Sequence, residues 1–335
     1  MRKAYHFFLA AILAGVSLLG LAACGSKTKT ADLTPVTLNE VAHSIFYAPQ
    51  YAAIELGYFE EEGINLTLVN GAGADKVMTA LISGDADIGF MGSEASIYTY
   101  ANGAEDYAVN FAQLTQRAGN FLVGRDSQPE FKWSDLKGKK VLGGRAGGMP
   151  QMVFEYILKK NGIDPATDLT IDQSINFGLT AAAFTSNEAD YTVEFEPFAT
   201  GLEKEGAGQV IASLGVDSGY VPYTAYSAKK SYMEKNPETI QKFTNAIQKG
   251  LEYVNSHSSE EIAKVIQPQF KETDAATIAT IIERYKSQDT WKGDTVFEKE
   301  SFELLENILE EAGQLKERVP YEELVITTYA EKAAK

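Results

Sequence analysis

The sequence has 335 residues, which is enough to bury the cores of two domains of ordinary size. Its formal net charge at pH 7 is −16, and such an acidic field repels phosphate, so nucleic acid and anionic lipid headgroups are excluded as favoured partners. It holds one cysteine, Cys24, which excludes an internal disulfide.

The N-terminal segment has the pattern of an export signal followed by a tether. Arg2 and Lys3 precede an apolar run that ends in small residues near Ala23, as in a secretory signal that is removed from the mature chain. An uncleaved anchor is the alternative, because the run is at the low edge of the roughly 17 to 25 residues that cross a bilayer. Residues 25–31, GSKTKTA, lack large apolar side chains and are typical of a flexible tether.

The residues Leu-Ala-Ala-Cys at 21–24 resemble the bacterial lipobox. The resemblance implies that residues 1–23 are a lipoprotein signal peptide and that the sulfur of Cys24 carries a diacylglycerol. The mature chain would then be anchored on the extracytoplasmic face of the cell membrane, with residues 24–31 as lipid anchor and tether. The alternative is a cysteine that packs as a small apolar side chain within the apolar run.

After the tether, short β-type runs alternate with helical patterns. Strands are predicted over residues 36–42, 64–69 and 86–91, and a helical pattern follows each of them. The helix after the second strand begins behind the glycines of residues 70–73. This β-α-β-α-β order predicts a parallel sheet with helices on its faces.

A second block repeats the scheme, with strands predicted over residues 139–144, 169–175 and 190–195. The C-terminal third is almost entirely helical, and one helix is expected to begin with Asn236 as N-cap and Pro237 in the first turn. The pattern predicts an α/β fold of two lobes with a helical C-terminal region.

Six motifs make the chain similar to a known family. They are A-P-x-Y-x-A at 48–53, G-Y-F-x-x-x-G at 57–63, S-G-x-A-D-I-G at 83–89, S-D-L-K-G-K-K-V at 134–141, E-P at 196–197 and N-P-E at 236–238. The chain resembles the solute-binding proteins of ABC importers, in the group that serves nitrate, sulfonates, taurine and thiamine pyrimidine precursors.

The resemblance implies the two-lobed periplasmic-binding-protein-like fold of type II, with the ligand in the cleft between the lobes. The first lobe would comprise residues 32–124 plus 216–335, with the helical C-terminal region packed on it, and the second lobe residues 125–215. It further implies a monomer whose partners are a small-molecule ligand, a permease with a separate ATPase, and the membrane through the lipid on Cys24.

Candidate ligand-binding residues follow from the rule that ligands of open α/β sheets lie beyond the carboxyl ends of the strands. Loops at these ends, together with one further arginine, supply the candidates His43, Tyr47, Gly71, Gly73, Ser93, Glu94, Arg117, Arg145, Gly147, Gly148, Phe177, Glu194 and Glu196. Free N–H groups at the helix starts after Gly73 and Gly148 favour a polar or anionic ligand group, although glycines there also serve tight turns.

Glu194 and Glu196 are two residues apart on a predicted strand, so both side chains point to one face while Val193 and Phe195 point to the other. If the glutamates face the cleft, they favour a cationic or amine-bearing ligand. The alternative for Glu196 is a favourable interaction with the N-terminus of the next helix.

The remaining polar candidates also have two interpretations. Arg117 and Arg145 can hold an anion in a bidentate contact, or they neutralise neighbouring glutamates. Tyr47 offers a face for stacking and one hydroxyl, and it stands where relatives that bind thiamine pyrimidine precursors often have the histidine of H-A-P. His43 can supply a polar group instead, or it is a surface or core histidine.

The favoured function is the capture of a small planar nitrogenous compound, such as a thiamine pyrimidine precursor, for an ABC importer. A sulfonate, taurine or nitrate is the alternative ligand, and a lipoprotein adhesin or receptor domain is a further alternative role. Pyrimidine synthases share this fold and are the enzymatic alternative, but the resemblance gives them a C-C-C-F-C motif and pyridoxal phosphate. With one cysteine and three histidines in the whole sequence, we expect no catalysis, cofactor or metal site.

Overall fold

The computed structural model describes residues 33–175 and 178–335. The predictions for the signal peptide, for Cys24 and for the tether fall outside the described residues, as does the prediction for Phe177. Residues 33–335 form one compact unit. In the part of the chain that is described, no helix is long and apolar enough to cross a membrane.

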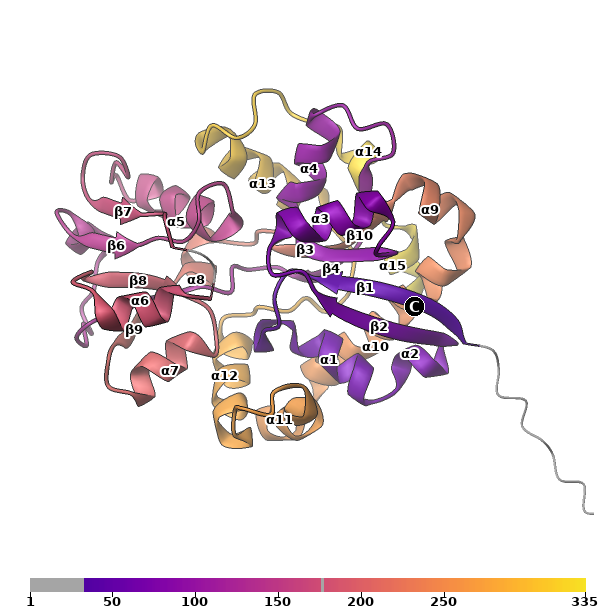
Figure 1. Cartoon of the computed structure of the whole chain (residues 1–335), viewed down its shortest axis with the longest axis horizontal. Helices are drawn as coiled ribbons and strands as arrows, with labels where there is room; N and C mark the ends of the chain where they lie inside the picture. The colour runs from indigo at the N-terminus through magenta and orange to yellow at the C-terminus, as the bar shows by residue number, and fades with distance from the viewer. Residues whose placement is uncertain (1–32, 176–177) are drawn as a thin grey trace, which may run out of the picture. The chain divides into compact units, whose positions relative to one another are not determined.

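The N-terminal end of the described chain and the C-terminus both lie on the side of the first sheet (Figure 1). In spatial order its strands are β2 (Ile64–Asn70), β1 (Thr34–Glu40), β3 (Ile88–Gly92), β10 (Thr224–Lys229) and β4 (Ala108–Thr115). Strands β1, β2 and β3 are parallel, and Leu38 lies opposite both Leu68 and Ile88. The late strand β10 runs antiparallel between β3 and β4. The predicted parallel sheet is therefore a mixed sheet.

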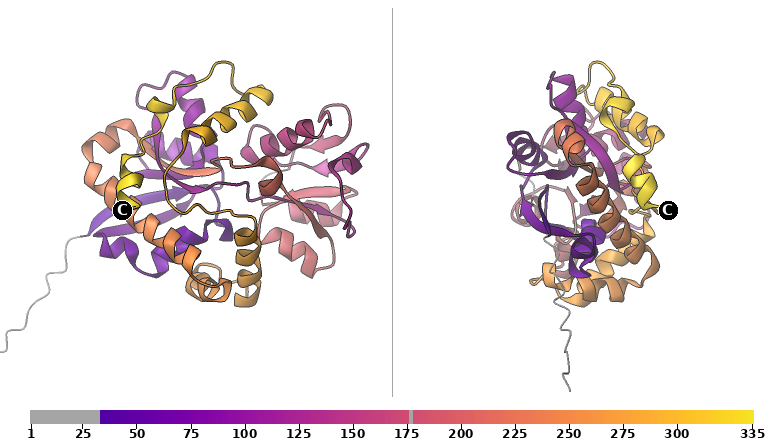
Figure 2. Two further views of the ribbon diagram at one scale, coloured as in Figure 1. Left: turned by 180° about the vertical axis from the view of Figure 1, so that it is seen from behind. Right: turned by 90° about the vertical axis from the view of Figure 1, so that its right-hand side faces the viewer.

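Helices cover both faces of the first sheet. Those that follow its early strands are η1 (Ile45–Tyr47), α1 (Ala48–Glu55), α2 (Tyr58–Glu61), α3 (Ala74–Ser83) and α4 (Glu94–Ala101). The C-terminal region adds α9 (Lys230–Lys235), α10 (Pro237–Ser256), α11 (Ser259–Ile266), η3 (Gln267–Gln269), α12 (Ala275–Ser287), α13 (Lys299–Glu311), α14 (Tyr321–Leu324) and α15 (Thr328–Ala333). Seen from behind, α10 lies across this sheet (Figure 2), which agrees with the predicted packing of the helical tail.

The long helix α10 begins as predicted, but its N-cap works differently. Pro237 is in the first turn and Asn236 precedes it. The Asn236 side chain accepts no capping hydrogen bond, and its amide donates to the carbonyl of Tyr232 instead. The proline fits because the first helical N–H has no partner within the helix.

The second sheet has the same topology as the first. Its strands in spatial order are β7 (Thr170–Asp172), β6 (Lys140–Leu142), β8 (Tyr191–Glu194), β5 (Phe121–Gly124) and β9 (Gln209–Ser213). Again three strands are parallel, and β5 runs antiparallel to its two neighbours. The accompanying helices are η2 (Trp133–Leu136), α5 (Met149–Lys160), α6 (Thr180–Ser186), α7 (Phe198–Lys204) and α8 (Leu214–Ser218). The predicted two-lobed α/β fold is confirmed.

The chain crosses between the sheets twice, after Thr115 of β4 and after Ser213 of β9. We call the part built on the first sheet the first lobe and the part built on the second sheet the second lobe. Residues 121–124, which were expected to belong to the first lobe, pair as β5 with β8 and β9 in the second sheet. The first crossing therefore lies a few residues earlier than expected.

One C-terminal helix also contacts the second lobe. Arg284 of α12 forms ion pairs with Glu196 and with Glu203, the latter at 2.7 Å. One turn along, Gln288 accepts a hydrogen bond of 2.6 Å from the hydroxyl of Ser213. These contacts fix the two lobes against each other on the side of α12.

Candidate functional site

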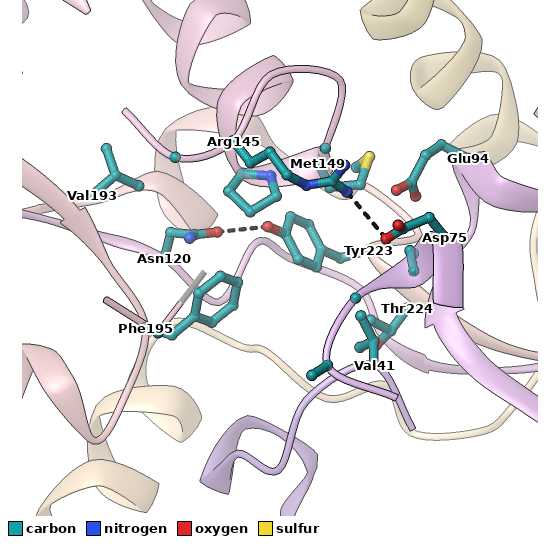
Figure 3. Close-up of a pocket in the computed structure, with 18 of the residues that line it drawn as sticks. Val41, Asp75, Glu94, Asn120, Arg145, Met149, Val193, Phe195, Tyr223 and Thr224 are labelled. Atoms are coloured by element: carbon teal, nitrogen blue, oxygen red, sulfur yellow. Dashed lines mark hydrogen bonds and ion pairs between the residues drawn. The ribbon is translucent and has the colours of Figure 1, made fainter. Parts of the chain in front are cut away.

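A cavity of about 360 Å³ lies between the two lobes (Figure 3). This volume is in the range of small-molecule sites, about 300 to 1,000 Å³. The first lobe contributes Val41, Tyr47, Ala72, Gly73, Ala74, Asp75, Lys76, Gly92, Glu94 and Thr224. The second lobe contributes Gly144, Arg145, Gly148, Met149, Pro150, Gly178, Thr180, Val193, Phe195 and Phe198, and the crossovers add Asn120 and Tyr223.

The loop between β2 and α3 forms one wall of the cavity with its backbone. Gly73 has φ 143°, a backbone conformation that residues other than glycine rarely adopt, and Ala72 has φ 52°. The N–H of Gly73 donates to the carbonyl of Val41 at 3.0 Å, which ties the loop to the end of β1. Helix α3 then begins at Ala74 beside the cavity.

Glu94 brings a buried carboxylate to the cavity. It is the first residue of α4, separated from the end of β3 by Ser93, and only 4 % of it is exposed. Its Oε2 has no hydrogen-bond partner among the described residues. Burial raises the pKa of the Glu94 carboxyl to about 7, while a hydrogen bond from its own backbone and the charge of Arg145 act in the opposite direction.

The carboxylate of Glu94 folds back over Gly92, which ends β3. A Cβ at position 92 would lie 2.1 Å from Glu94 Oε2 and 2.7 Å from its Oε1. Glycine is therefore required at position 92 for the glutamate to keep this place, because a side chain there would displace the carboxylate.

The two crossovers place a second polar pair at the cavity. The hydroxyl of Tyr223 donates to Asn120 Oδ1 at 2.6 Å (Figure 3). Asn120 is fully buried, and its Nδ2 has no partner in the part of the chain that the structure describes. The cavity therefore offers an unused amide donor in addition to the unused acceptor on Glu94.

Aromatic rings form much of the remaining wall. Tyr47, Phe195, Phe198 and Tyr223 all line the cavity. Behind them Phe46 packs against Tyr47, Phe195 and Tyr223, with ring centroids 5.1, 5.8 and 5.8 Å away. Burial raises the pKa of Tyr47 and of Tyr223 well above the ordinary value, so both hydroxyls stay neutral at physiological pH. Such walls suit a planar, partly apolar ligand.

One ion pair crosses from lobe to lobe beside the cavity. Arg145, in the loop between β6 and α5, lies 3.6 Å from Asp75 in the first turn of α3 (Figure 3). Both side chains are about half exposed or more, at 48 % and 65 %. The pair is thus at the solvent side of the site, whereas Glu94 and Asn120 are buried.

Of the predicted site residues, five line the cavity: Tyr47, Gly73, Glu94, Arg145 and Gly148. The others among the described residues do not. Gly71 packs against the first lobe, since a Cβ there would lie 2.6 Å from Asn39 Oδ1 and 2.7 Å from Val77 Cγ2. The N–H of Gly147 donates to Gln151 within the start of α5, at 2.9 Å.

The expectation that Glu194 and Glu196 face the cleft is wrong. Val193 and Phe195 line the cavity instead, so the opposite face of this segment is turned toward it. Glu194 accepts hydrogen bonds from the hydroxyls of Thr180 and Thr192, at 2.9 and 2.6 Å. Burial raises its pKa to about 7. The carboxylate is a structural group behind the cavity wall.

Glu196 is part of the contact between α7 and α12. Its carboxylate pairs with Arg284 and accepts hydrogen bonds of 2.9 Å from the backbone N–H and the hydroxyl of Thr200. Burial raises the pKa of Glu196, and the charge of Arg284 opposes this effect. The alternative interpretation, a role at the start of the following helix, is the better one.

His43 also has partners away from the cavity. Its Nδ1 lies 2.8 Å from Glu40 Oε1 and its Nε2 2.9 Å from the carbonyl oxygen of Gln269. Its ring stacks on Phe270 at 4.8 Å. The hydrogen bond to Glu40 raises the pKa of His43, with burial acting against it. The histidine joins the end of β1 to the C-terminal region.

Ser93 and Arg117 serve the crossovers. The hydroxyl of Ser93 donates to the carbonyl of Pro222 at 2.6 Å. Arg117 donates to the carbonyl of Gly215 at 3.0 Å and lies over the ring of Tyr220, 4.2 Å from its centroid. Neither residue lines the cavity, because these contacts hold both side chains against the chain between the lobes.

Sequence reasoning missed Asn120, Tyr223 and the apolar face of β8. The first two were outside the loops selected, because the rule used considers only strand ends that lead into helices. The expected positions of the two crossovers could have indicated Asn120 and Tyr223, because a chain that passes twice between two lobes borders the space between them. Among the described residues, no group of three or more His, Cys, Asp or Glu side chains could hold a metal ion.

Comparison with known proteins identifies relatives of two kinds. The chain is 46 % identical to a Bacillus subtilis (strain 168) protein named "Putative binding protein YtlA", over 94 % of this chain and 93 % of that protein. It is 27 % identical to the 4-amino-5-hydroxymethyl-2-methylpyrimidine phosphate synthase THI5 of Saccharomyces cerevisiae, over 62 % and 63 % of the two chains. The chain spans less than two thirds of the length of that synthase.

Among solved structures, the periplasmic aliphatic sulphonate binding protein SsuA of Escherichia coli superposes with a TM-score of 0.70. It is 17 % identical and the match covers 87 % of this chain and 97 % of SsuA, so the likeness concerns the fold. The family model described as NMT1/THI5 like matches residues 45–261, which include the second sheet, the first sheet except β1, and most of the cavity wall. The chain belongs to the NMT1/THI5-like family.

Proposed function

We propose that this chain is the extracytoplasmic substrate-binding lipoprotein of an ABC importer, and that it captures a small planar nitrogenous compound such as a thiamine pyrimidine precursor. The observation that carries the proposal is a cavity between two lobes to which both lobes contribute aromatic and polar side chains. The name of the Bacillus subtilis relative as a binding protein supports the same role.

The mechanism would be capture by closure. A ligand between the lobes contacts both of them only in the closed state, and this difference in contact shifts the population toward closure. The closed form would dock on a permease whose ATPase is a separate chain. The lipid on Cys24 and the tether of residues 25–31 would hold the protein beside the permease at the membrane.

The chemistry of the cavity favours a nitrogenous ligand over an anion. A sulfonate, taurine or nitrate would have to lie near the carboxylate of Glu94, which has no cationic partner within salt-bridge distance in the described chain. Tyr47, Phe195 and Tyr223 supply faces for a planar ring. An enzymatic role is disfavoured because the single cysteine of the sequence cannot form the cysteine-rich motif expected of the synthases.

Thermal denaturation of the soluble chain 25–335 tests the proposal. We expect 4-amino-5-hydroxymethyl-2-methylpyrimidine to raise the melting temperature, since a ligand at a hundredfold excess over its Kd adds about 2.7 kcal/mol of stability. Taurine and methanesulfonate at the same concentration are expected to have no effect. Stabilisation by the sulfonates alone would exclude the proposed ligand class and leave the importer role in place.

The location at the membrane is tested separately. The full chain with Cys24→Ser should be exported but recovered in the soluble extracytoplasmic fraction, whereas the wild-type chain should sediment with membranes. Sedimentation of both chains with membranes would contradict the lipid anchor.

A further inference from the structure

Two fully or nearly fully buried side chains that line the same cavity each have one polar atom without a hydrogen-bond partner among the described residues. One is Oε2 of Glu94, at the start of α4, and the other is Nδ2 of Asn120, in the first crossover. Buried polar atoms in folded proteins are nearly always hydrogen-bonded, because an unmade bond leaves the desolvation of the group uncompensated. An acceptor and a donor left free in one cavity indicate what a ligand has to supply.

The other buried polar side-chain atoms without a partner in the described chain are elsewhere. They belong to Asn39, Gln113, Arg117 and Gln241. None of these residues lines the cavity. The coincidence of an unpaired acceptor and an unpaired donor is therefore a property of this site among the described residues.

We propose that Glu94 and Asn120 together select the ligand: Glu94 accepts N–H bonds from a positively charged, amidine-like group, and Asn120 donates to an acceptor atom on the same molecule. This inference rests on the proposed function and narrows its substrate class to cationic nitrogen heterocycles and amidines that also carry a hydrogen-bond acceptor. A protonated aminopyrimidine with a polar substituent has this chemistry.

The surroundings of Glu94 support a proton-linked site. The charged groups beside the same cavity are Asp75 and Lys76 on α3 and Arg145 on the loop before α5. Burial and the charge of Glu94 raise the pKa of Tyr98, which stays neutral. Glu194 lies behind Thr180 with a pKa of about 7, so it titrates in the same range as Glu94 and has to be separated from it by mutation.

Binding of a fixed cation would therefore displace a proton. With the pKa of Glu94 at about 7, the apo carboxyl is mostly protonated at pH 6. When an amidinium ligand binds, the carboxyl proton passes to the buffer and the carboxylate pairs with the cation. As the pH increases toward 7, the affinity for the cation should rise by up to about tenfold per pH unit, and it should be constant above pH 7.

Isothermal calorimetry on the 25–335 chain tests the inference with two matched probes, benzamidine, a cation at each pH used, and benzamide, its neutral isostere. We expect wild type to bind benzamidine at least about tenfold more tightly than benzamide at pH 8 and to release close to one proton at pH 6. Proton release is measured by repeating the titration in buffers of different ionisation enthalpy, and it needs no variant that has to fold.

Variants assign the effect to residues, with 4-amino-5-hydroxymethyl-2-methylpyrimidine as a further probe. Glu94→Gln should weaken benzamidine at least about tenfold and abolish the pH dependence. Glu194→Gln removes an equally buried carboxylate that lies outside the cavity. This variant should leave the affinity for benzamidine and its pH dependence almost unchanged. Asn120→Ala should weaken the aminopyrimidine, which has acceptor atoms, more than benzamidine, which has none.

The outcomes separate the inference from the proposed function. If wild type binds the aminopyrimidine but Glu94→Gln binds it and benzamidine equally well, the inference is overturned and the proposed function stands. Equal affinities for benzamidine and benzamide would overturn it as well. If wild type binds taurine or methanesulfonate and none of the nitrogenous probes, the inference falls while the importer role stands. Failure to bind any probe would overturn both.

Discussion

The two lobes present buried carboxylates to the cavity region in different ways. On the first lobe, the carboxylate of Glu94 lies over Gly92, and one of its oxygens has no hydrogen-bond partner among the described residues. On the second lobe, Glu194 is held by two threonine hydroxyls and Glu196 by Arg284 and Thr200. All three are almost completely buried. Burial alone therefore does not distinguish a binding carboxylate from a structural one, whereas the presence or absence of hydrogen-bonding and ion-pair partners does.

The ion pair between Glu196 and Arg284 is expected to make the largest contribution to stability. Arg284→Ala would leave Glu196 buried without its ion-pair partner, so we expect the free energy of unfolding to fall by about 3 to 5 kcal/mol. Urea denaturation measures the change. Lys299→Ala is the control, because Lys299 pairs with Glu322 on an exposed surface and the loss of stability should be much smaller. Equal losses in the two variants would show that Glu196 does not depend on Arg284.

The next effect uses pH to compare Glu94 with Glu194. Each has a pKa of about 7 in the folded chain against an ordinary value of 4.5, so the folded state binds more protons than the unfolded state between these values. The free energy of unfolding therefore falls as the pH rises from about 4.5 to about 7, by up to about 3 kcal/mol for each group. This contribution to the free energy of unfolding is fully present below about pH 4.5 and lost above about pH 7.

Glu94→Gln and Glu194→Gln should each remove one share of that decline, as measured by urea denaturation at pH 5 and pH 8. The variants should differ in absolute stability. In Glu194→Gln an amide replaces a carboxylate that accepts hydrogen bonds from two threonine hydroxyls, so this variant should be the less stable one. In Glu94→Gln no hydrogen bond to another side chain of the described chain is lost. An unchanged pH profile in Glu94→Gln would mean that its carboxyl is not desolvated in the apo protein.

How much of this arrangement could be predicted depends on the element. Six strands, β1 to β3 and β6 to β8, fall in or overlap the predicted segments, because the β-α-β alternation of apolar runs and helical patterns marks them. Strands β4, β5, β9 and β10 were not assigned. Their antiparallel pairing joins segments that are distant in sequence, such as β4 with β10, and no local pattern records that partner.

The site shows the same limit at the level of single residues. Glu94 was found because it follows the carboxyl end of a strand. Glu194 and Glu196 were misjudged because alternation along a strand separates two faces but does not tell which face meets the cavity. That choice depends on the pairing of β5 with β8 and on Arg284, which is 88 residues beyond Glu196 in the chain. Asn120 and Tyr223 depend on how the crossovers pass between the lobes.

A smaller effect separates packing from ligand contact among the glycines of the first lobe. Gly71→Ala should cost about 1 to 3 kcal/mol, because the added methyl would meet Val77 and Asn39 within 2.7 Å. The control Gly201→Ala adds a methyl on helix α7 with no neighbour within 4 Å and should be neutral or slightly stabilising. Unfolding in urea measures both. If Gly71→Ala kept full stability, the tight packing of this loop would be refuted.

The smallest expected effect concerns the ion pair that joins the two sides. Arg145 and Asp75 are largely exposed, so Arg145→Met should change stability by at most about 1 kcal/mol. Because the charge of Arg145 lowers the pKa of Glu94, removing it should move the titration of Glu94 slightly above pH 7. The pH profile of unfolding in Arg145→Met, compared with Lys137→Met, measures this shift, since Lys137 pairs with Asp168 within the second lobe. A displaced midpoint in Arg145→Met alone would connect the exposed arginine of one lobe to the buried acceptor of the other, whereas equal midpoints would mean that Glu94 is shielded from the mouth of the cavity.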